Sequence, residues 1–288
     1  MINYNFAVFI LTHGRPNKVK TYKTLRKSGY TGKIYLLIDD QDKTIDEYRK
    51  YYTDKEIIVF SKEEARKITP TVFNHKMNQT AVFARNYNFI AAKKLKLDYF
   101  LQLDDDYQQF DYSSNEKNCY ATKNNTITNI DDVINSVLKF LEKTNIKTIA
   151  MAQSGDFIGG AHSNVGKLIP QNKFSRKAMN AFFCKTNNKV NFLAELNDDV
   201  NTYVKWGNLG KLFLTIPKLR LHQEITQKTK SGFTESYKKY GTYIKSFFTV
   251  MHNPSSIKVN HMGKNRRFHH KIIWKNTVPE IISYKYKK

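Results

Sequence analysis

The order of apolar segments in the first half of the chain constrains the fold most strongly. Short apolar runs alternate with longer segments in which apolar residues recur every third or fourth position. The short runs are typical of buried strands, and the longer segments are typical of helices. Strands separated by helices pair in parallel through right-handed crossovers. We therefore expect an α/β fold with a Rossmann-type, mostly parallel sheet flanked by helices.

The expected elements cover most of the chain. The expected strands are Phe6–Leu11, Lys33–Ile38, Glu56–Phe60, Tyr99–Leu103, Lys147–Gln153, Ala181–Lys185 and Leu212–Ile216. The expected helices are Lys18–Lys27, Ile45–Tyr52, Thr80–Leu95, Ile130–Thr144, Asp198–Trp206 and Thr234–Lys245. The glycine-containing segment Gly155–Gly160 is expected to be a loop. No internal repeat or low-complexity linker interrupts the chain, which favours one domain with a less regular C-terminal extension.

Positive charge is concentrated in the C-terminal third. The chain has 48 Lys and Arg against 25 Asp and Glu, a net +23. Residues 1–204 hold 30 basic and 22 acidic residues, whereas residues 205–288 hold 18 basic and only 3 acidic. Between Phe157 and Ala194 there are six basic residues and no acidic one. Such surfaces favour a polyanion such as nucleic acid as partner. The alternative is a solvated, lysine-rich surface without a partner.

Several classes of protein are excluded by composition. Abundant aromatic residues, 19 Phe and 18 Tyr, are incompatible with disorder along the whole chain. The longest uncharged apolar stretch, Phe6–Thr12, is far shorter than the roughly 20 residues that cross a bilayer. Met1 leads into this stretch without a basic region, so no secretory signal is expected. Cys119 and Cys184 lack metal-site spacing and suit a reducing cytoplasm.

Polar residues follow the expected strands, where open parallel sheets bind ligands. The first strand is followed by Thr12, His13, Gly14 and Arg15, a turn that suits a phosphate or nucleotide but equally suits an ordinary helix start. The second strand is followed by Asp39 and Asp40. Their carboxylates could accept hydrogen bonds from a ribose or a base edge, or form a solvated turn.

Three carboxylates, Asp104, Asp105 and Asp106, follow the fourth strand. Their mutual repulsion would be relieved by a hard divalent cation such as Mg²⁺ or Mn²⁺ with oxygen ligands. Asp104 and Asp106 point the same way in extended backbone, whereas Asp105 points elsewhere. The alternative is an acidic surface turn.

A second acidic group, Glu195, Asp198 and Asp199, precedes a helix in otherwise basic sequence. A carboxylate here could act as a general base towards a hydroxyl, or could cap the helix. Histidines gather later in the chain, and any of them could ligate a metal or contact phosphate.

This combination of strand-end motifs resembles a GT-A nucleotide-sugar glycosyltransferase. Five segments resemble more closely the TET-associated glycosyltransferases, a phage-centred family thought to glycosylate hydroxymethylated pyrimidines in DNA. The resemblance covers Phe6 to Ile282. Its segments read FILTHGRPNKVKTYKTLRKSGYTGKIYLLIDD, AVFARNYNFIAAKKLKLDYFLQLDDDY, LNDDVNTY, GTYIKSFFTVM and HHKIIWKNTVPEII.

The resemblance implies roles for individual residues. The implied donor-binding residues are Thr12, His13, Gly14, Arg15, Asp39, Asp40, Arg85, Asn86, Asp105, Gly159 and Gly160. The implied metal ligands are Asp104 and Asp106, with His269 or His270 as a late metal or phosphate ligand. Asp199 is the expected catalytic base, with Asp198 as the alternative, since the family pattern has Glu-Asp where this chain has Asp-Asp.

The resemblance also implies the reaction. A sugar would pass from a UDP-sugar to the hydroxyl of a 5-hydroxymethylpyrimidine, most readily 5-hydroxymethylcytosine, in double-stranded phage DNA, with Mn²⁺ or Mg²⁺ as cofactor. Residues 1–204 would form the donor-binding and catalytic core, and residues 205–288 a basic, DNA-binding part of the same domain. The expected location is the cytoplasm of an infected bacterium. The alternatives are a glycosyltransferase for protein or glycan acceptors and a non-catalytic nucleic-acid-binding protein of the same fold.

Overall fold

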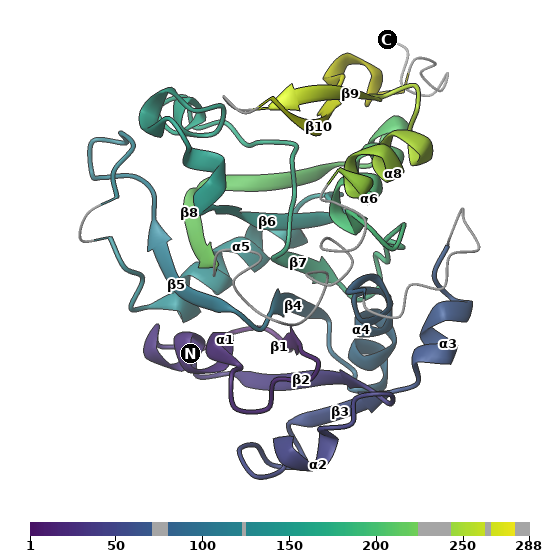
Figure 1. Cartoon of the computed structure of the whole chain (residues 1–288). Coiled ribbons are helices and arrows are strands. Elements are labelled where there is room, and N and C mark those ends of the chain that lie inside the picture. The colour runs from purple at the N-terminus through teal and green to yellow at the C-terminus, as the bar shows by residue number, and fades with distance from the viewer. Residues whose placement is uncertain (71–79, 123–124, 224–242, 263–265, 280–288) are drawn as a thin grey trace.

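The computed structural model describes residues 1–70, 80–122, 125–223, 243–262 and 266–279 of the 288-residue chain. Within these ranges, eight strands form one sheet in the order β3-β2-β1-β4-β7-β6-β8-β5 (Figure 1). The strands are β1 (Phe6–Leu11), β2 (Lys33–Asp39), β3 (Ile57–Phe60), β4 (Tyr99–Asp104), β5 (Tyr107–Tyr112), β6 (Thr148–Gln153), β7 (Phe182–Lys185) and β8 (Phe213–Gln223).

The sheet is mostly parallel, as expected. β3, β2, β1 and β4 pair in parallel, and so do β6 and β8. β7 is antiparallel to both β4 and β6, and β5 is antiparallel to β8. Because β7 opposes both of its neighbours, β4 and β6 run in the same direction. The carboxyl ends of β1, β2, β4 and β6 therefore meet at one edge of the sheet.

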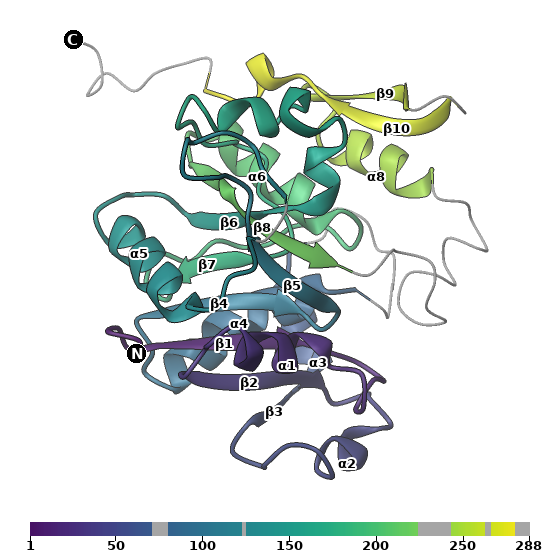
Figure 2. The same cartoon turned by 90° about the vertical axis from the view of Figure 1, so that its left-hand side faces the viewer.

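Helices cover both faces of this sheet (Figures 1 and 2). They are α1 (Lys20–Lys27), α2 (Ile45–Tyr48), α3 (Lys62–Lys67), α4 (Val82–Lys94), α5 (Ile130–Glu142), α6 (Asp198–Asn208) and α8 (Ile244–His252). Alternate side chains of β1 point to opposite faces. Val8 and Ile10 pack with α1 and α5, whereas Ala7 and Phe9 pack with α4 and α6. Two apolar cores thus hold the sheet between helical layers.

The segment after residue 242 joins α6 rather than standing apart. It contains α8 and a hairpin of β9 (Ile257–Met262) and β10 (Arg267–Ile272), followed by the short 3₁₀ turn η4 (Trp274–Asn276). Three asparagines of the α6 region bond to it. Asn197 Nδ2 donates to Thr249 Oγ1 at 2.8 Å, Asn253 Nδ2 donates to Asn201 Oδ1 at 2.9 Å, and Asn208 Nδ2 donates to Ser256 Oγ at 3.2 Å. The late segment is therefore anchored to α6 by polar side chains.

Three differences from the sequence-based expectation concern β5, β8 and the segment after β6. β5 was not among the expected strands, because its sequence YQQFDY is polar and buries only Tyr107, Phe110 and Asp111. β8 continues well beyond Ile216 by pairing with β5. Gly155–Gly160 is not an open loop, since it forms parts of the 3₁₀ turns η1 (Ser154–Phe157) and η2 (Gly160–His162).

The C-terminal elements that the structure describes also differ from the expected ones. The expected helix Thr234–Lys245 lies mostly outside the described residues, and the helix that the structure describes begins at Ile244. The β9–β10 hairpin was not expected, because its strands carry charged and polar residues without a clear apolar alternation. In the described ranges, no helix has the length and apolarity needed to cross a bilayer. Cys119 is exposed and Cys184 is buried, and both are free thiols.

Candidate active site

The turn after β1 is held by three side chains from other parts of the chain, those of Asp42, Tyr48 and Asp105. Thr12 is buried, and its Oγ1 donates to Asp105 Oδ2 at 2.8 Å while lying 2.9 Å from the Tyr48 hydroxyl. The same hydroxyl accepts from the Arg15 backbone N–H at 3.0 Å. Gly14 has a φ of +66°, a backbone conformation that favours glycine, and its N–H donates to Asp42 Oδ2 at 2.7 Å. The turn expected to hold the nucleotide is thus fixed before any ligand arrives.

The end of β2 carries a histidine–carboxylate–lysine group. His13 Nδ1 lies 2.6 Å from Asp39 Oδ2, and the buried Lys62 Nζ lies 3.4 Å from Asp39 Oδ1. The Asp39 hydrogen bond raises the pKa of His13. Burial raises the pKa of Asp39, but the hydrogen bond and charge of His13, with Lys62, outweigh it and lower that pKa. Asp40 is exposed and accepts from the Lys62 backbone N–H.

The carboxylate triplet sits on a backbone held by α1. Thr21 Oγ1 donates to the Asp104 carbonyl at 2.6 Å and accepts from the Tyr107 N–H at 2.9 Å. Asp105 is buried and receives Arg15 Nη1 at 2.9 Å. Burial raises the pKa of Asp105, against the lowering effect of the Arg15 charge. Asp105 therefore joins the triplet to the turn after β1.

Arg85 connects two acidic groups that are distant in sequence. Its side chain is only 3% exposed. Nη2 donates to Asp104 Oδ1 at 3.0 Å, and Nε donates to Asp198 Oδ2 at 2.7 Å. Burial lowers the pKa of Arg85, but the charges of Asp104 and Asp198 outweigh it, so the pKa is raised and the guanidinium stays charged. One buried cation thus positions the end of β4 against the start of α6.

Asp106 is the member of the triplet with the least compensation. Gln223 Nε2 donates weakly to its Oδ2 at 3.3 Å, while Oδ1 is buried without a hydrogen-bond partner. Burial, with the charges of Asp104 and Asp105, raises the pKa of Asp106 to about 7. A hard cation would relieve this cost, so the donor set fits Mg²⁺ or Mn²⁺. In the part of the chain that the structure describes, no three His, Cys, Asp or Glu side chains are arranged around a metal position. The remaining ligands would then be substrate or water oxygens.

The two carboxylates of α6 differ in their surroundings. Asp198 is held in the ion pair with Arg85. Asp199 is buried, and its Oδ1 accepts from the Val200 N–H at 2.7 Å. Burial and the charge of Asp198 raise the pKa of Asp199 to about 7. A carboxyl that titrates near neutrality is suited to proton transfer, so the environment favours Asp199 over Asp198 as a base.

Of the remaining residues expected to bind the donor, Asn86 lies in the interior, whereas Gly159 and Gly160 lie at the edge of the sheet. Asn86 is fully buried: its Nδ2 donates to Thr69 Oγ1 at 3.0 Å and to the Phe192 carbonyl at 2.9 Å, and its Oδ1 accepts from the Phe192 N–H at 2.7 Å. Both amide hydrogens are thus used within the fold, so Asn86 holds α4 to the Phe192 segment and is not placed to meet a donor. Gly159 and Gly160, with φ of +97° and +61°, lie beyond the carboxyl end of β6, on the same edge as the triplet.

The late histidines lie next to α6. His270 Nδ1 is 3.5 Å from Asn197 Nδ2, immediately before Asp198 in the chain, and the rings of His269 and His270 are 4.3 Å apart. Burial lowers the pKa of both histidines, that of His270 to about 3, so both are neutral at pH 7. Neutral imidazole is the metal-binding form. Within the described ranges, however, neither histidine joins Asp104 and Asp106 in a metal-binding arrangement.

Sequence reasoning missed several residues that build the site. Tyr48 lies in the short α2 and resembles an ordinary core residue in sequence. Gln223, next to Asp106, comes at the end of the unexpectedly long β8. Asp111 of β5 accepts from Arg220 Nη2 at 2.8 Å and lies 2.7 Å from His222 Nε2. The contacts of Asp111 with Arg220 and His222 depend on the pairing of β5 with β8, which the sequence does not reveal.

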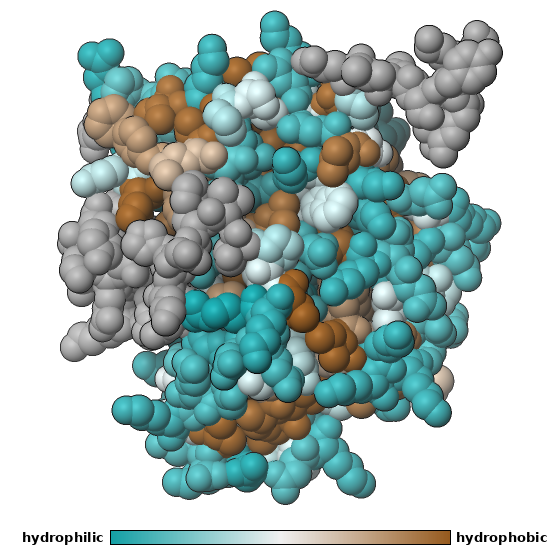
Figure 3. All heavy atoms as spheres, turned by 90° about the vertical axis from the view of Figure 1, so that its right-hand side faces the viewer, coloured by the Kyte–Doolittle hydropathy of each residue, from teal (hydrophilic) through white to brown (hydrophobic). Residues whose placement is uncertain are grey.

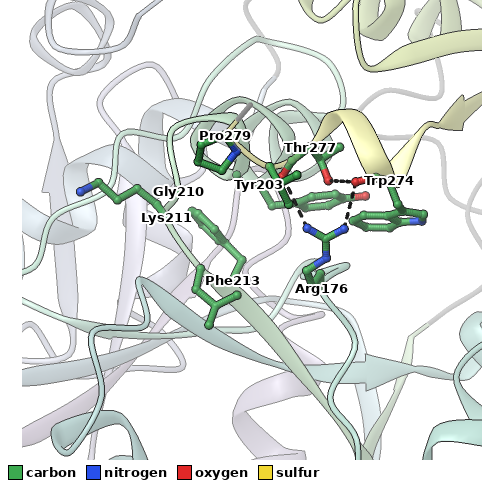
Figure 4. A pocket seen from close by; sticks show the side chains of 11 residues that line it. Arg176, Tyr203, Gly210, Lys211, Phe213, Trp274, Thr277 and Pro279 are labelled. Carbon is green, nitrogen blue, oxygen red and sulfur yellow. Dashed lines mark hydrogen bonds between the residues drawn. The ribbon is translucent and has the colours of Figure 1, made fainter. Parts of the chain in front are cut away.

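A separate pocket of about 200 Å³ lies between α6, the start of β8 and the segment around η4 (Figure 4). Arg176 lies 5.0 Å from the Trp274 ring and donates to the Trp274 carbonyl at 3.0 Å, and Tyr203 stacks on the same indole at 6.0 Å. None of the site residues expected from the sequence lines this pocket. The carboxylate edge of the sheet therefore remains the candidate site.

Solved structures similar to this chain share little of its sequence. No curated protein matches the chain. Among solved structures, the chain is similar to glucosyl-3-phosphoglycerate synthase from Mycobacterium tuberculosis in complex with Mn²⁺ and UDP-glucose, with 7% identity, a TM-score of 0.48, and coverage of 94% of this chain and 86% of that one. It is also similar to S. aureus TarS 1–349, with 12% identity, a TM-score of 0.41, and coverage of 76% and 60%.

A family model gives the more specific result. The model of the TET-Associated Glycosyltransferase family matches residues 6–232, which is well over half of the chain. The matched range includes the turn after β1, the carboxylate triplet, Arg85 and the acidic pair of α6. The chain therefore belongs to the TET-associated glycosyltransferase family.

Proposed function

We propose that this chain transfers a sugar from a UDP-sugar to the hydroxymethyl group of a 5-hydroxymethylpyrimidine, in the first place 5-hydroxymethylcytosine, in double-stranded DNA. The observation that carries the proposal is the bridge made by Arg85. It holds Asp104 of the triplet and Asp198 of the acidic pair on one buried guanidinium. A donor-side carboxylate group and a candidate base thereby share one edge of the sheet, as sugar transfer requires.

The nucleotide would lie over the turn after β1. The His13 side chain is 45% exposed, and its raised pKa favours an imidazolium that can meet an anionic diphosphate. Asp39 and the exposed Asp40 offer acceptors for ribose or base hydrogens. Arg15 and Thr12 are bonded to Asp105, so they act by fixing that carboxylate for contact with ribose or sugar. Gly159 and Gly160 would border the sugar or the acceptor.

Asp104 and Asp106 would hold a divalent cation. The buried and unpartnered Oδ1 of Asp106 supports this assignment, as does the raised pKa of its carboxyl. When bound, Mn²⁺ or Mg²⁺ supplies Lewis-acid stabilisation to the leaving diphosphate. His269 or His270 would contact phosphate or the cation, and burial lowers the pKa of both, which favours the neutral imidazole that binds metals. Arg85 keeps Asp104 oriented.

Asp199 would take the proton of the acceptor hydroxyl. Burial and the charge of Asp198 raise its pKa to about 7, which suits a base that gains and loses a proton near neutral pH. A single displacement with this base inverts the anomeric carbon. Asp198 is occupied by Arg85 and is the weaker candidate.

The basic C-terminal third supports DNA as the acceptor. Residues 205–288 carry 18 basic and 3 acidic residues. A net charge of this size favours a polyanion.

Mass spectrometry of nucleosides tests the proposal. Duplex DNA containing 5-hydroxymethylcytosine is incubated with UDP-glucose and Mn²⁺, digested and analysed. We expect a nucleoside heavier by one hexose. Asp106→Asn and Asp199→Asn should reduce its yield strongly, whereas the matched surface variant Asp54→Asn, at a carboxylate that is 82% exposed, should not.

Other outcomes separate the parts of the proposal. If several UDP-sugars are hydrolysed in the presence of Mn²⁺ but no hydroxymethylated pyrimidine is modified, the DNA acceptor is wrong and a protein or glycan acceptor becomes the better assignment. If calorimetry detects no binding of UDP with Mn²⁺, the donor assignment is wrong as well.

A further inference from the structure

On the face of the molecule shown in Figure 3, the described hydrophobic residues are exposed in separate groups, with hydrophilic residues between them. Exposed apolar residues in this arrangement are ordinary on a protein surface and indicate no particular partner. A less ordinary feature lies at the carboxylate edge of the sheet. There, Asn180 and Gln223, two amide residues without a role in the proposed function, lie between Arg85 and Asp106.

Asn180 and Gln223 complete a closed circuit of polar contacts. Arg85 Nη2 donates to Asp104 Oδ1 at 3.0 Å, and Nη1 donates to the Asn180 carbonyl at 3.2 Å. Asn180 Nδ2 donates to Gln223 Oε1 at 3.1 Å, and Gln223 Nε2 donates to Asp106 Oδ2 at 3.3 Å. The backbone between the two aspartates closes the circuit. These five residues, Asp104, Asp106, Arg85, Asn180 and Gln223, form the carboxylate circuit.

The carboxylate circuit joins four segments that are far apart in sequence. One of its carboxylates ends β4, and Arg85 belongs to α4. Asn180 lies two residues before β7, and Gln223 is the last residue of β8. The pairing of β8 with β5 places Gln223 opposite Tyr107, which directly follows Asp106. Because the sheet and α4 hold these segments, the circuit fixes both carboxylates relative to the sheet edge.

The direction of the bonds follows from the chemistry of the carboxylate. An ionised carboxylate can only accept hydrogen bonds, so the amide of Gln223 turns its Nε2 towards Asp106. Gln223 Oε1 then needs a donor, which Asn180 Nδ2 supplies. The other oxygen of Asp106, Oδ1, is buried and has no hydrogen-bond partner among the described residues. The circuit therefore holds one oxygen of Asp106 and leaves the other for a cation.

Asn180 has a backbone conformation that few residues adopt. Its φ is +59°, in the left-handed region, and the Ala181 N–H donates to the Met179 carbonyl across it at 2.7 Å. Glycine adopts such a φ most readily, and asparagine is one of the few other residues that tolerate it. Glycine, however, has no amide to offer to Gln223. A sparsely populated conformation that is kept together with a specific contact is typical of functional sites.

We propose that Asn180 and Gln223 are positioning residues for the divalent cation, and that they orient Asp106 for binding it while Arg85 orients Asp104. The proposal rests on the proposed function, because it takes Asp104 and Asp106 as the cation ligands. Neither amide is itself a ligand, since each acts through a carboxylate. Hydrogen-bond partners that orient metal ligands contribute on the order of ten- to a hundredfold to metal affinity.

Electron paramagnetic resonance of free Mn²⁺ tests the proposal without sugar transfer. Mn²⁺ is titrated into the full chain in the presence of UDP, and the signal of the free ion gives the dissociation constant. Gln223→Met keeps the length of the side chain but removes both amide bonds, and should raise this constant about tenfold or more. Asn180→Gly keeps the left-handed turn and the carbonyl that Arg85 uses, and removes only the bond to Gln223. It should raise the constant about threefold.

Two further measurements separate positioning from a general loss of structure. The double variant Asn180→Gly with Gln223→Met should bind Mn²⁺ as well as Gln223→Met does, because Asn180 acts through Gln223. In competition against Mn²⁺, Gln223→Met should weaken the binding of Mg²⁺ more than that of Ca²⁺. Mg²⁺ requires near-ideal octahedral geometry, whereas Ca²⁺ accepts variable geometry. A general loss of structure would weaken the binding of both ions alike.

Asn118→Gly is the matched control for Asn180→Gly. Asn118 also has a φ of +59°, and its Nδ2 donates to another side-chain amide oxygen at 3.3 Å, but it contacts no member of the carboxylate circuit. Gln171→Met is the control for Gln223→Met, since Gln171 is exposed and its Nε2 donates to a backbone carbonyl. Both controls should keep the wild-type affinity for Mn²⁺. Thermal melts show which variants are folded.

The outcomes separate this inference from the proposed function. If the wild type binds Mn²⁺ with UDP and folded Gln223→Met binds it equally well, the positioning role is overturned and the proposed function stands. If Gln223→Met does not fold, an unchanged dissociation constant in Asn180→Gly overturns the positioning role in the same way. If the wild type binds no Mn²⁺ with UDP, both proposals are wrong. If the variants bind Mn²⁺ more weakly but the wild type modifies no DNA, the positioning role is upheld and only the DNA acceptor is wrong.

Discussion

The carboxylate edge of the sheet and the surface of α8 and the hairpin use charge in opposite ways. At the carboxylate edge, buried or half-buried cations have carboxylate partners, such as Arg15 with Asp105 and Lys62 with Asp39. On the hairpin, Lys258 and Lys271 oppose each other and no acidic residue is near them in sequence. Paired charge fixes the geometry of side chains, whereas unpaired charge is available for a partner. The net charge of the chain alone conceals this division.

The largest effect is expected for Arg85→Met. The change removes the buried cation that Asp104 and Asp198 share, and leaves two carboxylates without compensation. We expect urea denaturation to show a loss of about 3–5 kcal/mol in the free energy of unfolding. The rate of sugar transfer should fall on the order of a hundredfold or more, because Arg85 no longer holds the carboxylate triplet in a fixed position relative to the acidic pair of α6.

Arg49→Ala is the matched control for Arg85→Met. Arg49 also bonds to two carboxylates, those of Asp46 and Asp54, but it is 48% exposed. The expected change in unfolding free energy is only about 0–1 kcal/mol. Similar effects of the two arginine variants would show that the acidic groups at the sheet edge are not coupled through Arg85.

Asp199→Asn is expected to act on catalysis. If Asp199 is the base, kcat should fall on the order of 10²–10⁴-fold. In the wild type, kcat/KM should rise with pH through about 7, because only the deprotonated carboxyl accepts a proton. If kcat/KM instead stays constant across the neutral range, from about pH 6 to about pH 8, a residue other than Asp199 is the base.

The carboxylate edge should also give stability an unusual pH dependence. Asp106 and Asp199 have pKa values of about 7 in the folded chain, above the ordinary value for aspartate. Between about pH 4 and 7 the folded state therefore binds more protons than the unfolded state. The free energy of unfolding should fall by about 1–3 kcal/mol as pH rises through this window. Asp106→Asn should reduce the fall, and Mn²⁺ with UDP should restore stability at pH 8 only when Asp106 is present.

Tyr48→Phe should have a moderate effect. The hydroxyl bonds to Thr12 Oγ1 and accepts from the Arg15 N–H in a buried setting. Its removal should cost about 1–2 kcal/mol in unfolding free energy and weaken UDP binding measured by calorimetry. Tyr51→Phe, at an exposed ring, should change neither quantity.

The smallest effect on stability is expected for Lys258→Gln with Lys271→Gln. Removing two opposed like charges should change the unfolding free energy by no more than about 0.5 kcal/mol, in the stabilising direction. A thermal melt at low salt measures it. A clear destabilisation would mean that these lysines serve the fold, and would remove the contrast between the two regions.

The sequence predicted the first half of the fold well because its strands are apolar. β1, β2, β4 and β6 are fully or nearly fully buried and differ from the expected bounds by no more than a residue at either end. β5 and the hairpin were missed because edge strands with polar side chains carry no apolar alternation. Their identity depends on pairing with β8 and with each other, which is a property of the tertiary structure.

The sequence predicted where the residues of the candidate site lie in the fold, but not which hydrogen bonds and ion pairs they form. Strand ends indicated the turn after β1, the triplet and the acidic pair. Arg85 was expected to face the donor, but it is buried between Asp104 and Asp198. Asn86 was also expected to face the donor. Its amide instead bonds to the Phe192 carbonyl in the interior, because adjacent residues on a helix face different directions. Hydrogen-bond partners more than a hundred residues apart cannot be derived from local sequence.

The asparagines of the α6 region set a lower limit on the size of the working unit. Asn197, Asn201 and Asn208 bond to side chains between Thr249 and Ser256, all beyond the last residue of the family match. A chain ending at residue 232 would leave these amides of the α6 region without the partners they have in the structure. The boundary of the family match is therefore not a boundary at which the protein can be cut. Any attempt to transplant or shorten this transferase has to carry α8 and the residues up to Ser256 along.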